Sequence, residues 1–258
     1  MKRLTKIFLL FIVILTLGAC STDSSSTDSN DQLIIGIDDA FAPMGFRDEN
    51  NNIVGFDIDL AKAVGEQMDT KVVFQPIDWG SKETELQSGR IDLIWNGYTV
   101  TEERKQKVLF TEPYLANAQV IVTLKDSEIN SLNDLAGKSV GLQAQSSASN
   151  ALNNSEIASE IKDITEFKTN VLALQDLDNG RIDAVVIDEV VIDYYMTLKP
   201  DTYKVLEESL APELYAVGVK KGNNELLEKV QKAMDEIIKN GTAAEISEKW
   251  FGENKILN

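Results

Sequence analysis

The sequence contains no histidine, and Cys20 is its only cysteine. Without histidine the chain cannot form a Ser-His-Asp or Cys-His catalytic centre, and it offers no imidazole to zinc or copper. One cysteine excludes a disulfide within the chain and a metal site built from several thiolates. We therefore expect a protein that uses no metal ion and no cofactor.

Positive charge and long apolar runs are also scarce. There are 25 Lys and Arg residues against 42 Asp and Glu, which gives a formal net charge of -17. Such a charge argues against nucleic acid or anionic lipid as a partner of the folded part. The apolar run over residues 7–17 is too short to span a bilayer, because a spanning helix needs roughly 20 residues.

The amino terminus has the pattern of an export signal. A basic start, the apolar run and small residues before Cys20 predict a signal peptide over residues 1–19. The order Leu-Gly-Ala-Cys resembles the lipobox of bacterial lipoproteins, which implies cleavage before Cys20 and lipid, including palmitate, on the mature chain. Loss of three cations would leave that chain near -20. The alternative is an ordinary secretory signal with an incidental cysteine.

Residues 21–30 contain only Ser, Thr, Asp and Asn. This composition cannot bury enough apolar surface to fold, so we expect a flexible tether. Residues 20–30 would then join a lipid anchor to a folded part that lies at the membrane surface.

Two segments of the remaining chain begin alike, with Gly-Arg-Ile-Asp at 89–92 and again at 180–183. Strands and helices are expected to alternate in the same order around both copies, a pattern typical of parallel α/β sheets. We predict two α/β lobes, residues 31–118 with 214–258 and residues 119–213. Two crossover strands, near 117–122 and 210–216, would form a hinge.

Ligands of open α/β sheets bind beyond the carboxyl ends of the strands. The residues expected there are Asp38, Phe41, Trp79, Asn96, Gly97, Thr99, Arg104, Gln143, Ser146, Ser147 and Asp188. A guanidinium such as that of Arg104 binds a carboxylate through two parallel hydrogen bonds, and Asp188 suits an ammonium group. The set therefore favours a free α-amino acid.

Each of these residues also has a purely structural interpretation. The arginine lies in the charged segment "TEERKQK", where it would ordinarily face solvent, and Asp188 is placed to cap a helix. The aromatic residues are of the kind that fill cores. Asp57 and Asp59, near the start of a predicted helix, are expected to cap it.

Several blocks of the sequence together resemble the extracellular solute-binding proteins of ABC importers for polar amino acids. These blocks are "DDAFAPMGF", "GFDIDLAKAV", "IDW", "GRIDLIWNGYTVTEER", "VGLQAQSS", "GRIDAVVIDEV", "AVGVKKGNNEL" and "EISEKWFG". The resemblance implies a periplasmic-binding-protein fold of two lobes, each a mostly parallel sheet flanked by helices, that close on a ligand.

The resemblance also implies roles for individual residues. Arg104 matches the arginine that holds the ligand carboxylate, with Gly97 and Thr99 in the neighbouring loop, and Asp188 matches the acid that binds the ammonium group. The remaining positions match aromatic walls (Phe41, Trp79), a pocket-edge acid (Asp38), a small-residue loop (Ser146, Ser147) and a residue within reach of the ligand side chain (Gln143). Gln145 departs from the pattern, because many relatives have glycine there.

The expected partners are a small amino acid, an ABC permease and the membrane through the lipid anchor, and the expected state is a monomer on the extracellular face of a bacterial cell membrane. We expect a neutral polar amino acid such as glutamine or cystine, since the predicted side-chain subsite lacks a cation. Two alternatives remain, an enzyme of the dehydratase type on the same fold and a surface adhesin or sensor.

Overall fold

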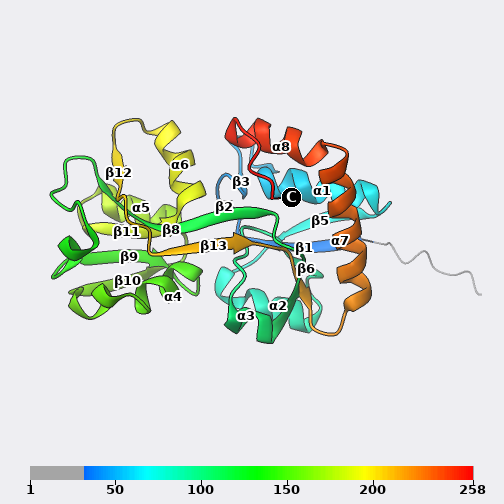
Figure 1. Cartoon of the computed structure of the whole chain (residues 1–258), viewed down its shortest axis with the longest axis horizontal. Helices are drawn as coiled ribbons and strands as arrows, with labels where there is room; N and C mark the ends of the chain where they lie inside the picture. The colour runs from blue at the N-terminus through cyan, green and yellow to red at the C-terminus, as the bar shows by residue number, and fades with distance from the viewer. Residues whose placement is uncertain (1–31, 258) are drawn as a thin grey trace, which may run out of the picture. The chain divides into compact units, whose positions relative to one another are not determined.

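The computed structural model describes residues 32–257. The predicted signal peptide, Cys20 and the tether lie outside the described residues. Within residues 32–257, none of the helices combines the length and the apolar character that a membrane span requires. The described part forms two lobes, each built on its own sheet (Figure 1).

The first lobe is built on a five-stranded sheet. Its strands lie in the order β5 (Lys71–Pro76), β1 (Gln32–Ile37), β6 (Leu93–Ile94), β14 (Gly218–Lys220) and β7 (Val108–Phe110). The first three are parallel, whereas β14 is antiparallel to both of its neighbours. Short strands β2 (Ala40–Phe41), β3 (Gly45–Arg47) and β4 (Ile53–Val54) form a separate small sheet that follows β1.

The second lobe repeats this arrangement. Its strands lie in the order β10 (Asp163–Phe167), β9 (Ser139–Gln143), β11 (Ala184–Asp188), β8 (Leu115–Leu124) and β12 (Tyr203–Val205). Strand β11 pairs with β9 just as β6 pairs with β1: both pairs are parallel, and β10 and β5 lie on the opposite sides of β9 and β1. The two Gly-Arg-Ile-Asp segments therefore precede equivalent strands, as the repeat predicts.

Two strands connect the lobes. The first half of β8 pairs with β13 (Ala211–Tyr215), and its second half pairs with β11 and β12 of the second sheet. Figure 1 shows β8 and β13 side by side between the lobes. The predicted lobe boundaries at 118/119 and 213/214 fall inside these two strands. The prediction of two crossover strands is confirmed.

Helices cover the sheets because one face of each helix is apolar. In α1 (Phe56–Gln67), Phe56, Leu60 and Val64 are fully buried, at the spacing of one helix face. The other helices of the first lobe are α2 (Lys82–Ser88), α3 (Glu102–Lys107), α7 (Asn224–Lys239) and α8 (Thr242–Phe251), with a 3₁₀ turn at Trp79–Ser81. Those of the second lobe are α4 (Ser147–Asn153), α5 (Asn170–Asp178) and α6 (Glu189–Leu198), with 3₁₀ turns at Leu132–Leu135 and Glu156–Glu160.

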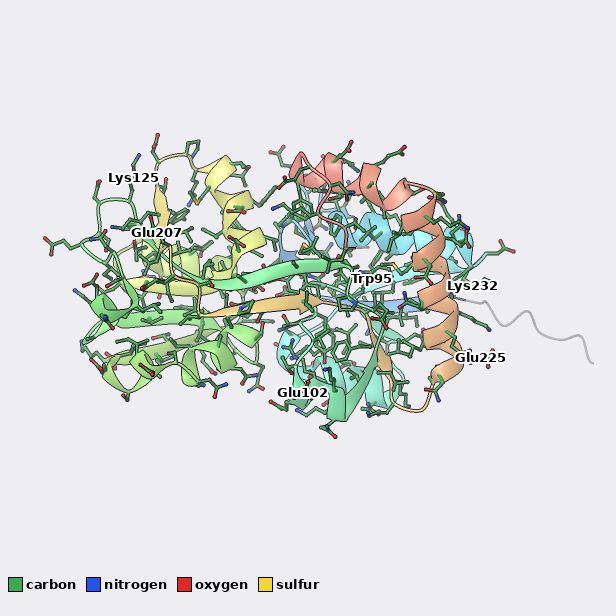
Figure 2. The ribbon with its side chains drawn as sticks, in the orientation of Figure 1. Trp95, Glu102, Lys125, Glu207, Glu225 and Lys232 are labelled. Atoms are coloured by element: carbon green, nitrogen blue, oxygen red, sulfur yellow. The ribbon has the colours of Figure 1, made fainter. Side chains whose placement is uncertain are left out.

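The carboxyl-terminal segment returns to the first lobe. Helices α7 and α8 pack against α1, although 170 residues or so separate them in the sequence. Buried Val230, Met234 and Ile237 of α7 join the core that contains β1. Figure 2 shows the side chains over both lobes, with Trp95 in the interior and Lys125 and Glu225 at the surface.

Candidate functional site

The predicted site residues lie where the carboxyl ends of strands from both lobes meet. Asp38 follows β1, Asn96 to Thr99 follow β6, and Gln143 and Asp188 end β9 and β11. Apart from Gly97, which is also buried, the exposed fraction of the eleven predicted residues ranges from 1% to 7%. All eleven residues are therefore buried.

Two direct contacts join predicted residues of opposite lobes. The Oγ1 of Thr99 lies 3.1 Å from the Oγ of Ser147. The Nε2 of Gln143 donates a hydrogen bond of 2.6 Å to Oδ2 of Asp38. Burial raises the pKa of the Asp38 carboxyl, and the hydrogen bond from Gln143 partly opposes that rise. Asp38 and Gln143, which are 105 residues apart in the sequence, thus lie together on one side of the candidate site.

Asp188 is at the centre of a hydrogen-bond network that the sequence did not predict. Its Oδ1 accepts hydrogen bonds from Nδ2 of Asn117 at 2.8 Å, from Nε2 of Gln119 at 2.7 Å and from the hydroxyl of Tyr215 at 2.5 Å. The same two amides donate to Oε2 of Glu213, at 3.1 and 3.0 Å. Burial, and then the nearby charge of Glu213, raise the pKa of Asp188 to about 7.

This network contains more acceptors than donors. Thr99 donates a further hydrogen bond of 3.0 Å to Glu213. The Oε1 of Gln119 is buried and has no hydrogen-bond partner among the residues that the structure describes. Two carboxylates and a free amide oxygen in a buried position favour a cationic donor such as an ammonium group.

The network residues that sequence reasoning missed lie on the two crossover strands. Asn117 and Gln119 are two apart on β8, and Glu213 and Tyr215 are two apart on β13. Successive side chains of a strand point to opposite faces, so each pair shares a face. Polar residues at alternate positions of the predicted crossovers were therefore a usable signal.

Asp57 does not cap helix α1, which corrects the expectation for this residue. Its Oδ2 accepts a hydrogen bond of 2.7 Å from the backbone nitrogen of Gly97, and its Oδ1 accepts one of 2.8 Å from Tyr114. Gly97 has a φ of 58°, a conformation that favours glycine. Asp57 thus fixes the backbone of the loop after β6, and burial raises its pKa to about 7.

Asp59 also makes contacts other than a cap. It accepts hydrogen bonds from Nζ of Lys249 at 2.6 Å and from Nε1 of Trp250 at 2.9 Å, both in α8. No side chain accepts a capping hydrogen bond at the start of α1, where Gly55 is the first flanking residue. Two acids in the first helical turn do complement the helix dipole, but their carboxylates serve tertiary contacts.

Arg104 is held at the start of helix α3. The side chain of Thr101 caps this helix by accepting a hydrogen bond of 3.1 Å from the backbone nitrogen of Arg104. The guanidinium group donates one hydrogen bond, of 2.9 Å, from Nη1 to the carbonyl of Thr99, and lies 4.6 Å from the centre of the Tyr98 ring. The arginine is only 5% exposed, so it is not a solvated helix charge.

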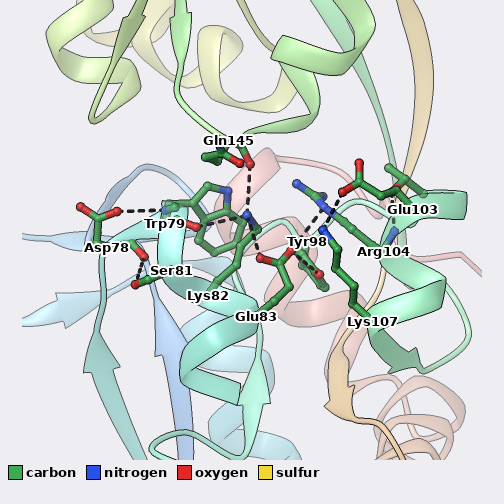
Figure 3. A network of polar contacts seen from close by, with 12 residues as sticks. Asp78, Trp79, Ser81, Lys82, Glu83, Tyr98, Glu103, Arg104, Lys107 and Gln145 are labelled. Carbon is green, nitrogen blue, oxygen red and sulfur yellow. Dashed lines mark hydrogen bonds and ion pairs between the residues drawn. The ribbon is translucent and has the colours of Figure 1, made fainter. Parts of the chain in front are cut away.

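Glu83 lies next to Tyr98, on the same side of this guanidinium group (Figure 3). Its Oε1 accepts a hydrogen bond of 2.9 Å from Tyr98 and is 3.9 Å from Nε of Arg104. Its Oε2 is 3.4 Å from Nζ of Lys82. A polar cavity of about 170 Å³ adjoins these groups, and its lining also includes Gln145 and Ser146.

The aromatic residues Phe41 and Trp79 are both buried, at 6% and 7% exposure. Phe41 packs against the loop after β6, where a β-carbon added to Gly97 would be 2.7 Å from its ring. Trp79 makes an edge contact with Tyr98, with 6.0 Å between ring centres. Asn96 is 1% exposed, and neither polar atom of its side chain has a partner within the described residues.

Over residues 32–257 there is no group of three or more Cys, Asp or Glu side chains that could hold a metal ion. The side chains of the buried cluster can form hydrogen bonds and ion pairs. Its strongest cation, Arg104, belongs to the first lobe, and Asp188 belongs to the second.

Comparisons with known proteins show which family the chain belongs to. An arginine-binding extracellular protein of Bacillus subtilis (strain 168), ArtP, is 32% identical over 258 residues, which cover 99% of this chain and 100% of the relative. The structure of an ABC uptake transporter substrate-binding protein from Streptococcus pneumoniae with bound histidine has 43% identity and a TM-score of 0.86, and it covers 89% of this chain and 96% of that one.

A third similar structure is an ancestral arginine-binding protein bound to glutamine. It has 43% identity and a TM-score of 0.81, with coverage of 86% of this chain and 99% of that one. The model of the bacterial extracellular solute-binding proteins, family 3, matches residues 33–253. The chain therefore belongs to family 3 of the bacterial extracellular solute-binding proteins.

Proposed function

We propose that the protein binds a free L-amino acid between its two lobes outside the cell and delivers it to an ABC importer. The observation that carries this proposal is the burial of Arg104 and Asp188, which have opposite charges and come from different lobes. A zwitterion is a ligand that contacts both groups at once. Its contacts would stabilise the closed form over the open one, because they require both lobes.

The ammonium end of the ligand would lie at Asp188. Glu213 and the unpaired Oε1 of Gln119 add acceptors beside it. A buried carboxylate is costly unless it is paired with a cation and hydrogen-bonded. An ammonium group supplies both the charge and the donors.

The carboxylate end would lie between Arg104 and the loop of Ser146 and Ser147. Among residues 32–257 the guanidinium group donates a single hydrogen bond, to Thr99, so it retains donors for a ligand carboxylate. The contact between Thr99 and Ser147 marks where the two lobes approach each other at this end.

The ligand side chain would lie near Asp38, Phe41, Trp79 and Gln143. The sequence favoured a neutral polar ligand, because no cation was expected in this subsite, but the ammonium group of Lys82 lies 5.1 Å from the centre of the Trp79 ring. The buried Asp38 carboxylate, whose partners here are the Gln143 amide and the backbone of Ala40, also suits a ligand side chain that donates hydrogen bonds or carries positive charge. The relatives, one named for arginine binding and two with bound histidine or glutamine, support testing both classes.

The remaining elements of this proposal concern the setting in which the protein works. A lipid on Cys20 and the tether of residues 21–30 would hold the folded part on the extracellular face of the membrane. The closed, ligand-bound monomer would then be the form that the permease recognises. Family membership and the binding proteins among the relatives support delivery to a permease, and the sequence pattern before Cys20 supports the lipid.

The first experiment is a thermal-shift screen with all amino acids and cystine, followed by calorimetry on the best compounds. A true ligand raises the melting temperature with concentration. Arg104→Ala should weaken binding by at least about 30-fold, because truncating one partner of a buried charge pair costs on the order of 2 kcal/mol or more.

Arg104→Lys is the matched control, since it keeps the charge but loses the planar fork, and it should retain part of the affinity. Circular dichroism of both variants should match that of the wild type. Wild-type affinity in Arg104→Ala would refute the assignment of the carboxylate subsite.

An enzyme on the same fold is the second candidate. The buried Asp188, whose pKa is raised to about 7, has the property of a general base. Mass spectrometry of the bound compound after prolonged incubation distinguishes the two candidates, because a binding protein returns its ligand unchanged. Failure to bind any amino acid would instead favour an adhesin or sensor.

A further inference from the structure

Lys82 is a buried cation that the ligand site described above does not use. It occupies the first position of α2 and is only 2% exposed. Its Nζ donates a hydrogen bond of 3.1 Å to the carbonyl of Trp79, in its own lobe. A second hydrogen bond, also of 3.1 Å, goes to the carbonyl of Gln145 in the opposite lobe.

Figure 3 shows this contact, with Gln145 above Lys82 and Glu83 beside the ammonium group. The charged groups that face Lys82 are Glu83, at 3.4 Å, and the cations Arg104 and Lys107. Burial, and then the charge of Arg104, lower the pKa of Lys82 to about 8. A buried ammonium needs acceptors, and one of its three comes from the other lobe.

The acceptor lies in the loop that precedes helix α4. Gln145 has a φ of 57°, in the left-handed region, and the next residues are Ser146 and Ser147 of the candidate site. The side chain of Gln145 also faces the first lobe, since its Cγ would be 3.5 Å from a β-carbon on Gly80. The loop is therefore tied to the first lobe at Gln145.

We propose that Lys82 is a closure latch: by donating a hydrogen bond to the Gln145 carbonyl across the cleft, it stabilises the closed form and raises affinity without recognising the ligand side chain. The predicted effect on affinity rests on the proposed function, whereas the predicted effect on closure of the ligand-free protein does not. A contact made only in the closed form increases the closed fraction, and apparent affinity scales with that fraction. Lys82 is thus a positioning residue.

The test compares Lys82→Met with the wild-type protein. Methionine has similar length and keeps the site filled, but it donates no hydrogen bond. Affinity should fall about tenfold, in line with a hydrogen bond from a charged group. The fall should be the same for every amino acid that binds, and it should come from faster dissociation.

Gln145→Gly is the matched control. It removes the side chain but keeps the carbonyl that accepts the hydrogen bond, and glycine readily adopts the positive φ. Its affinity should remain within about twofold of the wild type, a difference much smaller than the tenfold loss above. A loss as large as that of Lys82→Met would assign the effect to the Gln145 side chain and overturn the latch.

Closure itself is measured by pulsed electron spin resonance without any ligand. Spin labels on Lys62→Cys and Lys162→Cys, in a Cys20→Ser background, report the distance between the lobes. Lys82→Met should shift the ligand-free distribution toward the longer distance. An unchanged distribution, or a loss of affinity for only one class of amino acid, would overturn the proposal.

The test also covers two other outcomes, a variant that does not fold and a wild-type protein that binds no amino acid. If Lys82→Met fails to fold by circular dichroism, Lys82→Gln replaces it, and it should also lengthen the ligand-free distance because its side chain is shorter and uncharged. If the wild-type protein binds no amino acid, the proposed function fails, yet the distance measurement still supports or overturns the latch.

Discussion

Asp188 combines features that are unfavourable in an isolated folded protein. It is 5% exposed, and Glu213 shares its amide donors. Desolvation opposes the charged form of a buried carboxyl, and a nearby second carboxylate adds to the effect. Strained electrostatics of this kind are typical of functional sites, where a bound ligand relieves them.

Binding is expected to depend on pH through Asp188. Its pKa is raised to about 7 in the folded chain, so the carboxyl gains a proton as pH falls below about 7 and loses its attraction for an ammonium group. Affinity should fall by up to tenfold per pH unit below about 7. Calorimetry in two buffers of different ionisation enthalpy should show proton release on binding near pH 6.5.

Asp57 is the internal control for this prediction, because its pKa is also raised to about 7. Asp57→Asn should keep the pH dependence of binding if Asp188 is responsible. The sign for stability is opposite to that for binding. A raised folded-state pKa stabilises the ligand-free fold at low pH, and that contribution is lost as pH rises through about 7.

At the scale of single elements, helix α3 depends on its cap and its surroundings for stability. It is six residues long, Glu102–Lys107, which is far shorter than an isolated helix that is stable in water. The cap from Thr101 satisfies the backbone nitrogen of Arg104. The position of the guanidinium group therefore depends on the helix start.

Thr101→Ala should lower the free energy of unfolding by about 1 kcal/mol, the usual effect of losing an N-cap. It should also weaken amino-acid binding, because Arg104 loses its fixed backbone. Urea unfolding and calorimetry on one preparation measure both quantities. Thr101→Ser keeps the capping oxygen and should behave as the wild type; equal losses in both variants would contradict the role of the cap.

At the scale of the whole molecule, net charge and burial act on different steps of binding. The full sequence carries a formal charge of -17, and its field extends over the surface. The candidate site residues are nearly inaccessible to solvent, so salt screens them poorly once the lobes are closed. The net charge of the protein should therefore affect the association rate of the ligand more than its dissociation rate.

This separation predicts how salt acts on the two ligand classes. The association rate of a cationic amino acid should fall as ionic strength rises from about 0.01 to about 0.5 M, because the Debye length shortens from roughly 30 Å to a few ångströms. The association rate of glutamine should change little. Stopped-flow fluorescence measures these rates, and equal salt dependence for both ligands would contradict the role of net charge.

The sequence alone determined the architecture, and it suggested the two polar ends of the proposed site. The repeated Gly-Arg-Ile-Asp segments predicted two equivalent lobes, and β6 and β11 occupy equivalent places. Strand-end reasoning predicted that Arg104 and Asp188 face one cleft, because parallel strands present their carboxyl ends at one edge, and both side chains are buried. Local pattern is sufficient for these features, since hydrophobic periodicity fixes the strands and their order fixes the edge.

Only the tertiary structure decided which side chains complete the site. Glu213 and Gln119 come from crossover strands whose register with each other cannot be read from either strand alone. Asp57 looked like a helix cap, yet it accepts a hydrogen bond from Gly97, 40 residues away. The contact between Lys82 and Gln145 spans 63 residues. Such contacts depend on how the lobes close, and sequence spacing carries no information about that geometry.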